Sequence, residues 1–166
     1  RTCCLPIYDG HNLIYSTIRW DAGVTCIQSH PFDPNQIAVG RYALPLSVKL
    51  FIQLETRSYD ETVRIFDPRN LLRPVSGLSV GGGVWRVKWC PQPERKTDLL
   101  VACMHDGFKV TRISDAGSEN KIIQEFREHE SLAYGVDWCH AKAKRNGKSL
   151  VGSCSFYDHK LHIWSG

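Results

Sequence analysis

The sequence lacks any long hydrophobic run. Its longest apolar stretch, residues 43–54, is interrupted by Pro45, Lys49 and Gln53, whereas a membrane-spanning helix needs about 20 consecutive apolar residues. The first residues also lack the basic segment followed by an apolar one that marks a secretory signal. We therefore predict that the chain is not an integral membrane protein and has no membrane partner.

Helical periodicity is equally scarce, since apolar residues never recur at i, i+3, i+4 and i+7 beyond one or two turns. Short segments rich in Val, Ile and aromatic residues, separated by Gly, Pro, Asp or Asn, dominate instead. The sequence therefore predicts an all-β fold. The expected strands are residues 63–66, 84–89, 99–104, 108–113, 122–126, 134–138, 150–154 and 161–164.

The seven cysteines include no C-x-x-C pair, and their number is odd. Zinc sites and redox motifs use such pairs, so we predict neither a metal site nor a disulfide framework. Free cysteines are usually small buried residues. Seven reduced thiols favour a cytoplasmic location.

The formal net charge of +4 is modest. Only one dense basic run occurs, at Lys142, Lys144, Arg145 and Lys148. No aromatic residues are interleaved there to stack on bases. We therefore interpret this run as a solvated loop and predict no nucleic-acid partner; no cofactor is predicted either.

The chain contains three similar units, each with a strand, a turn near Pro or His, a second strand, an aspartate and a third strand. The aspartates are Asp60, Asp106 and Asp158. Six residues after them stand Phe66, Arg112 and Trp164. The intervals between the aspartates, 46 and 52 residues, slightly exceed the roughly 40–45 residues of a four-stranded propeller blade.

This pattern resembles the WD-repeat β-propeller over about residues 23–164. Phe66-Asp67 stands where that family has Trp-Asp, and His129 lies nine residues before Trp138, where its Gly-His pair places the histidine. The resemblance implies that His129, Asp158 and Trp164 form a structural hydrogen-bond relay within a blade. Asp60 and Asp106 have the same implied role in their units. Trp20, Val80 and Arg112 depart from the motif, so we expect the first two blades to be less rigid.

The length allows about three blades. Propellers have 4–8 blades of roughly 40–45 residues, so seven blades need about 300 residues and 166 residues cannot close a ring. We therefore predict a partial propeller over residues 23–166, preceded by a leader or the end of another blade over residues 1–22. The missing blades would come from a longer protein or from another chain, and the oligomeric state stays open.

Residues 41–57 do not fit the repeat. Joining Gly40 directly to Ser58 gives IAVGSYDETVRIFDPRN, which continues the unit without interruption. We interpret these 17 residues as an insertion, such as a translated intron. A natural surface loop is the alternative, although loops of this length are uncommon in compact domains.

Four strings narrow the resemblance further: GGGVWRVKWCP, LVACMHDGF, HESLAYGVDW and GSCSFYDHKLHIW. Together and in this order they are similar to the WD-repeat protein of diphthamide biosynthesis, the diphthine methylesterase. That resemblance implies hydrolysis of a methyl ester on methylated diphthine, with translation elongation factor 2 as the protein partner. A non-catalytic WD-repeat scaffold is the alternative, because GSCSF lacks the second glycine of a hydrolase nucleophile elbow.

Two sets of WD-repeat positions usually face the surface on which partners bind. Here they are Tyr59, His105 and Tyr157, and Thr25, Trp85 and Tyr134. Diphthine carries a trimethylammonium group, and aromatic faces attract such cations. We therefore predict that Trp85, Tyr134 and Tyr157 form a substrate cage; the alternative is ordinary blade packing.

The same surface offers a candidate catalytic residue. His105 is the predicted general base, because an imidazole can take a proton from water at neutral pH; the alternative is an exposed turn residue. The glycines at residues 81–83 allow a close backbone approach, could present N–H groups to an oxyanion, or form a flexible connector.

Overall fold

The computed structural model describes residues 2–9, 12–19, 23–42, 61–69, 73–114, 119–141 and 147–166. These residues form thirteen strands and one short 3-10 turn, Pro93–Arg95. Every strand expected from the sequence overlaps one of the observed strands. The predicted all-β class is confirmed.

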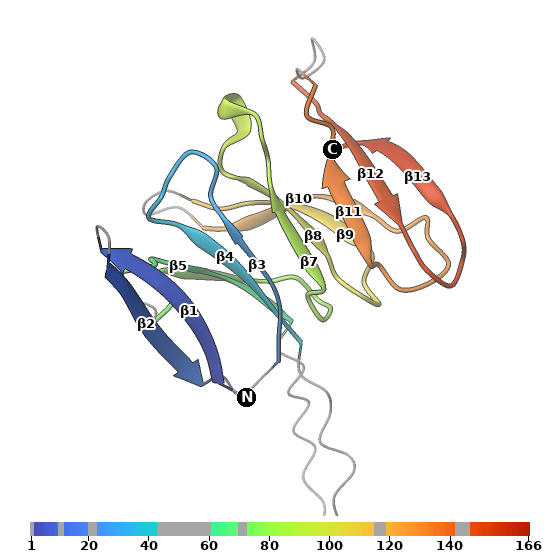
Figure 1. The fold of residues 1–166 in the computed structure, drawn as a ribbon. Coiled ribbons are helices and arrows are strands. Elements are labelled where there is room, and N and C mark those ends of the chain that lie inside the picture. Colours follow the sequence, from blue (N-terminus) through green and yellow to red (C-terminus); the bar gives the residue numbers. More distant parts are fainter. Residues whose placement is uncertain are drawn as a thin grey trace, which may run out of the picture.

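A separate antiparallel hairpin lies near the start of the chain. It consists of β1 (Thr2–Asp9) and β2 (Asn12–Arg19), with Thr2 opposite Arg19 and Asp9 opposite Asn12. The sequence assigned no strand to this leader. Figure 1 shows the hairpin in dark blue.

The remaining strands form three antiparallel sheets, each joined in chain order as in a propeller. The first blade contains β3 (Gly23–Ser29), β4 (Ile37–Tyr42), β5 (Thr62–Phe66) and β6 (Ser76–Ser79). The second contains β7 (Arg86–Trp89), β8 (Asp98–Ala102), β9 (Phe108–Arg112) and β10 (Lys121–Phe126). The third contains β11 (Gly135–Trp138), β12 (Leu150–Cys154) and β13 (Leu161–Ser165). Figure 1 shows the three blades following one another around the molecule.

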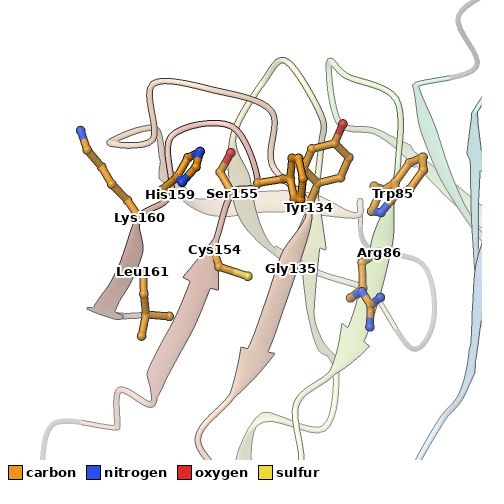
Figure 2. Close-up of a pocket in the computed structure, with 10 residues that line it drawn as sticks. Trp85, Arg86, Tyr134, Gly135, Cys154, Ser155, His159, Lys160 and Leu161 are labelled. Atoms are coloured by element: carbon orange, nitrogen blue, oxygen red, sulfur yellow. The ribbon is translucent and has the colours of Figure 1, made fainter.

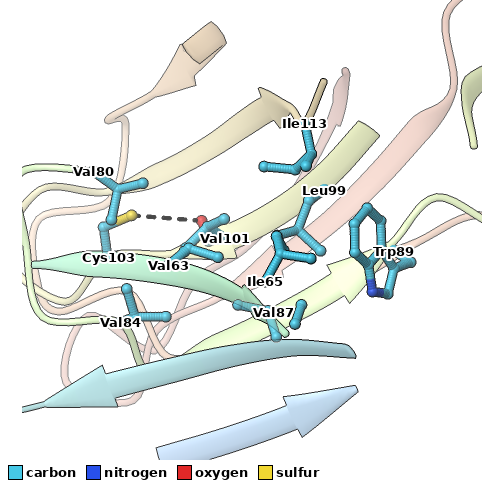
Figure 3. Close-up of a cluster of buried hydrophobic side chains, with 11 residues drawn as sticks. Val63, Ile65, Val80, Val84, Val87, Trp89, Leu99, Val101, Cys103 and Ile113 are labelled. Atoms are coloured by element: carbon cyan, nitrogen blue, oxygen red, sulfur yellow. Dashed lines mark hydrogen bonds between the residues drawn. The ribbon is translucent and has the colours of Figure 1, made fainter. Parts of the chain in front are cut away.

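The core consists of two hydrophobic clusters, one on each face of the second blade. The first joins side chains such as Val63 and Ile65 of the first blade to Leu99 and Val101 of β8 (Figure 3). The second includes Leu100 of β8 together with residues of the third blade. Because side chains alternate across a strand, β8 serves both clusters, and all five of its residues are buried.

The pairing register corrects one position in the repeat. Trp138 and Trp164 both lie opposite Val151, whereas Trp89 and Thr111 both lie opposite Leu99. Thr111 therefore occupies the place of the third blade's tryptophan. Arg112, which the sequence count had placed there, lies opposite Asp98 instead.

The count failed because the hairpin turns differ in length. Six residues separate the paired Cys154 and Leu161, whereas five separate Ala102 and Phe108. Arg112 instead binds the carboxylate of Asp98. Its Nε and Nη2 donate hydrogen bonds of 2.8 and 3.1 Å to the carboxylate of Asp98.

The predicted insertion begins within a strand. Arg41 and Tyr42 end β4 and lie opposite Val24 and Gly23, whereas residues 43–60 lie outside the described part of the chain. Gly40 pairs with Val63. Joining Gly40 to Ser58 would leave five residues, 58–62, in this turn, which is the length of the turn in the second blade. The insertion remains a prediction. It is supported by the turn length, because without residues 41–57 the first blade would have a turn as long as that of the second blade.

Polar contacts fix the third blade against the second. Trp138 Nε1 donates a 2.9 Å hydrogen bond to the carbonyl oxygen of Lys88, and Arg95 Nη1 donates one of 2.7 Å to the carbonyl oxygen of Gly166. The Arg95 Nε also pairs with the fully buried Asp98 at 2.7 Å. These contacts hold β7 and β11 side by side.

The five described cysteines, Cys26, Cys90, Cys103, Cys139 and Cys154, are all free thiols. Burial raises the pKa of Cys26, Cys90 and Cys103 above the ordinary thiol range. Across the described residues, no helix has the length and hydropathy needed to cross a bilayer. The same residues contain no group of three His, Cys, Asp or Glu side chains placed to hold a metal ion.

Candidate functional site

An open hollow of about 800 Å³ lies where β7 and β11 begin and β12 ends (Figure 2). It is lined by Trp85, Arg86, Tyr134, Gly135, Cys154, Ser155, Phe156, His159, Lys160 and Leu161. Trp85 and Tyr134 immediately precede β7 and β11. The hollow therefore contains two of the three aromatic residues predicted to bind substrate.

Four aromatic side chains form a continuous row at this hollow. The ring centroids of Trp85 and Tyr134 are 5.3 Å apart and those of Tyr134 and Tyr157 are 6.1 Å apart. The structure thus brings the three predicted cage residues together. Phe156 extends this aromatic row, 5.2 Å from Tyr157. Phe156 was not predicted, because only its neighbour Tyr157 stands at a WD-repeat surface position.

The aromatic row remains accessible to a ligand. Trp85 is 37% exposed, Tyr157 62% and Phe156 74%. Trp85 and Tyr134 meet nearly at a right angle, 83°. Such edge-to-face pairs use the edge of one ring, so ring faces remain for a cation or an apolar group.

The backbone that carries Trp85 and Tyr134 is well anchored. The Trp85 N–H donates to the carbonyl oxygen of Ala102 at 2.9 Å, and the Thr25 hydroxyl donates to that of Val84 at 2.5 Å. The N–H of Ala133, just before Tyr134, donates to the carbonyl oxygen of Met104 at 2.8 Å. Thr25, a predicted surface position, therefore supports the site rather than lining it.

His105 does not line this hollow. It lies on a neighbouring hollow of about 340 Å³, together with His129, Glu130, Ser131 and Leu132. His105 is exposed. The structure therefore separates the predicted general base from Trp85 and Tyr134, whereas another histidine, His159, shares their hollow.

The turn between β12 and β13 provides the other polar groups of the hollow. His159 has a left-handed backbone with φ of 58°. Lys160 Nζ lies 2.6 Å from Glu130 Oε1, and this contact raises the pKa of the lysine. Ser155 is 6% exposed, and its hydroxyl has no hydrogen-bond partner among the described residues. The exposed Cys154 thiol lies beside them.

The residues of the expected relay are in hydrogen-bond contact in the third blade. His129 Nδ1 lies 2.8 Å from Asp158 Oδ2, and His129 Nε2 lies 3.0 Å from Ser153 Oγ. Trp164 Nε1 donates a 3.1 Å hydrogen bond to the same hydroxyl. Burial opposes ionisation of Asp158, but hydrogen bonds from the Lys160 N–H, His129 and the Glu130 N–H outweigh it and lower the pKa of that carboxyl.

This relay has the connectivity of a Ser-His-Asp hydrolase triad. Its serine, however, is 1% exposed, and the side chain of His129 is 2% exposed. The Ser153 hydroxyl is also engaged by both His129 and Trp164. A nucleophile must reach the carbonyl carbon of its substrate, so we keep the structural interpretation for this relay.

An ion-pair cluster stands in the corresponding place of the second blade. Lys109, 3% exposed, lies opposite Val101 and pairs with Asp106 at 2.5 Å, and Arg127 pairs with the same carboxylate at 2.7 Å. Asp106 thus interacts with cations instead of a histidine. Asp60 of the first blade lies outside the described residues.

Two of the three predicted loop glycines pack against this cluster. Gly81 has a φ of 78°, and a Cβ added to it would collide with the Asp106 carboxylate. At Gly82 an added Cβ would collide with the carbonyl oxygen of Cys103. The close backbone approach anticipated for this segment is therefore observed at Gly81 and Gly82.

No model of a known protein family matches the chain, but individual relatives do. A "Diphthine methyltransferase homolog" of Dictyostelium discoideum is 41% identical over 155 residues, which cover 89% of this chain and 36% of the relative. The resemblance to diphthamide-biosynthesis proteins is confirmed. The "Diphthine methyltransferase" of Mus musculus is 37% identical over 82% of this chain and 26% of its own length. That of Schizosaccharomyces pombe is 36% identical over 67% of this chain and 32% of its own length.

The chain thus spans about a third of the length of the Dictyostelium and yeast relatives and about a quarter of the mouse relative. Among solved structures, the β-propeller domain of Cps50 (Swd1) from Myceliophteria thermophila aligns with 90% of this chain and 59% of its own. Its TM-score is 0.42 and its sequence identity 17%.

Proposed function

We propose that this protein hydrolyses the methyl ester of methylated diphthine on translation elongation factor 2, in the cytoplasm. The observation that carries the proposal is the contiguous row of Trp85, Tyr134 and Tyr157 at an open hollow. The names of the three relatives described above refer to diphthine and support the same substrate.

The aromatic row suits the cationic part of this substrate. A trimethylammonium group cannot donate hydrogen bonds, so ring faces are its natural partners, and each contact contributes roughly 0.5–2 kcal/mol. Trp85 and Tyr134 border the hollow from two different blades. A cation that contacts the free ring faces of both would fix the substrate at the boundary between the second and third blades.

The ester chemistry requires a base and donors to the developing oxyanion. The sequence-based assignment of the base to His105 remains a hypothesis, and it requires the ester to reach the smaller hollow beside His129. If His105 is the base, His105→Ala should lower kcat by roughly 10²–10⁴-fold.

Mass spectrometry of elongation factor 2 that carries methylated diphthine tests the function. After incubation with the chain, we expect the factor to lose the mass of one CH2 unit, because hydrolysis replaces the methyl group of the ester by hydrogen, and we expect methanol to appear. Trp85→Ala should raise KM, whereas Phe32→Ala should not, because Phe32 is an exposed aromatic residue of the first blade outside the aromatic row. A separate incubation of less methylated factor with a methyl donor tests for methyl transfer, the reaction that the relatives' name describes.

A non-catalytic scaffold is the second candidate. Exposed aromatic residues such as Tyr157 and Phe156 are also enriched at protein interfaces. Binding of the modified factor with the ester left intact, and with Trp85→Ala weakening that binding, would favour the scaffold over the esterase.

A further inference from the structure

We propose that His159 is the general base of the ester hydrolysis, acting within the hollow that Trp85 and Tyr134 border. The inference rests on the proposed function and identifies a catalytic residue for it. Its basis is the position of His159, the unusual backbone of that residue and the way in which its turn is held.

The position follows from the chemistry of the substrate. In methylated diphthine the ester carbon is bonded to the carbon that carries the trimethylammonium group. A cation held by Trp85 and Tyr134 therefore leaves the ester in the same hollow, and a general base must come within about 3 Å of the proton that it removes, or act through one water. His159 lines that hollow, whereas His105 lines the neighbouring one.

The backbone at His159 supports a functional role. Its φ of 58° is left-handed, a conformation that glycine adopts without the steric cost borne by other residues. Gly107 directly follows Asp106 in the second blade's turn, as His159 follows Asp158 here, and it has a φ of 74°. The third blade thus has a histidine where the second blade has a glycine. Strain of this kind tends to persist at functional sites.

The turn that carries His159 is held on both sides. Asp158 accepts hydrogen bonds from the N–H of Lys160 at 2.9 Å and from the N–H of Glu130 at 3.2 Å, in addition to its contact with His129. The Lys160 side chain also pairs with Glu130, so it joins the turn to the same segment before β11. The His129–Asp158 contact of the structural relay therefore also holds the turn that carries His159 in place.

The reaction balances with water as the only co-reactant. The His159 imidazole takes one proton from water as the water oxygen forms a bond to the ester carbonyl carbon. The carbon–methoxy bond then breaks, and the imidazolium returns the proton to the departing methoxide, which leaves as methanol. The carboxylic acid that remains ionises to the carboxylate.

Two substitutions test the role of His159 without straining the turn. Both His159→Gly and His159→Asn suit a left-handed backbone. In the full chain, with methylated diphthine on elongation factor 2 as substrate, each should lower kcat by roughly 10²–10⁴-fold with little change in KM. Added imidazole should restore part of the turnover of His159→Gly, which a merely structural role would not allow. His140→Asn is the matched control and should retain wild-type turnover, because the exposed His140 lines neither hollow. His105→Asn tests the alternative base.

The outcomes separate the inference from the function on which it rests. No hydrolysis by the wild-type chain would overturn the proposed function and this inference together. Hydrolysis by the wild type and equally by both His159 variants would overturn the inference alone. If His105→Asn is inactive and His159→Asn is active, the base is His105. A loss in His159→Gly that imidazole cannot rescue, together with a lowered melting temperature, would assign His159 a structural role and also overturn the inference.

Discussion

His129 Nδ1 lies 2.8 Å from Asp158 Oδ2, and this contact joins the segment before β11 to the turn between β12 and β13. Asp158 is next to His159 in the chain, so one hydrogen bond of the blade's framework directly supports the proposed catalytic turn. Stability and activity are therefore expected to be coupled in the third blade.

Ser153→Ala should destabilise the protein by about 1–3 kcal/mol, because it leaves His129 Nε2 and Trp164 Nε1 without their shared buried partner. Ser155→Ala is a matched control, since Ser155 is also buried but its hydroxyl has no partner among the described residues. Urea unfolding of both variants measures the difference. Equal midpoints would show that the relay adds no stability.

Acidification should weaken the third blade through Asp158. Its pKa is lower in the folded state than the ordinary carboxyl value, so its ionised form stabilises the fold above about pH 4. That contribution is lost as the pH falls through the lowered folded-state pKa. Asp158→Asn should be less stable at neutral pH and lose less stability on acidification than the wild type. Parallel stability profiles of the two proteins between neutral and acid pH would contradict this role.

Deleting residues 41–57 should raise the soluble yield and the resistance to proteases. The deletion leaves five residues between the paired Gly40 and Val63, as in the second blade, and removes a largely apolar segment of the kind that promotes aggregation. Expression of both forms followed by limited proteolysis provides the measurement. Identical yields and cleavage rates would favour a natural surface loop.

All seven thiols should be free, and they should react in order of exposure. The thiolate is the reactive form, so among the five described cysteines the exposed Cys154 should be alkylated first. Cys103 is fully buried and its pKa is raised, so it should react only on unfolding. Mass spectrometry under native, non-reducing conditions gives the order, and Cys154→Ser identifies the fast site. A stoichiometric disulfide, or labelling of Cys103 at the rate of Cys154, would contradict the prediction.

The strands were predictable because their side chains meet buried surface at regular intervals. In β9, Phe108 and Val110 alternate with Lys109 and Thr111 after Gly107, and the structure places a strand there. Trp85, Tyr134 and Tyr157 were also found from the sequence, since the repeat puts each of them near the end of a strand. Their contact follows from the packing of one blade on the next.

Other features depend on turn geometry, which the sequence does not reveal. The one-residue difference between two hairpin turns moved Arg112 out of the relay position and put Thr111 there. The same kind of local geometry separates His105 from the larger hollow and brings His159 into it. The sequence did contain a signal for His159, which stands where the second blade has Gly107. That difference can be interpreted only once the left-handed backbone of both residues is known.

The burial of β8 on both faces sets the order in which the molecule can open. A strand with one solvent-exposed face exchanges its amide hydrogens through small local fluctuations. The strand β8, in contrast, becomes exposed only when the second blade separates from both neighbouring blades. Deuterium uptake should therefore be slowest along this strand. In the middle blade, local opening and global unfolding become the same event.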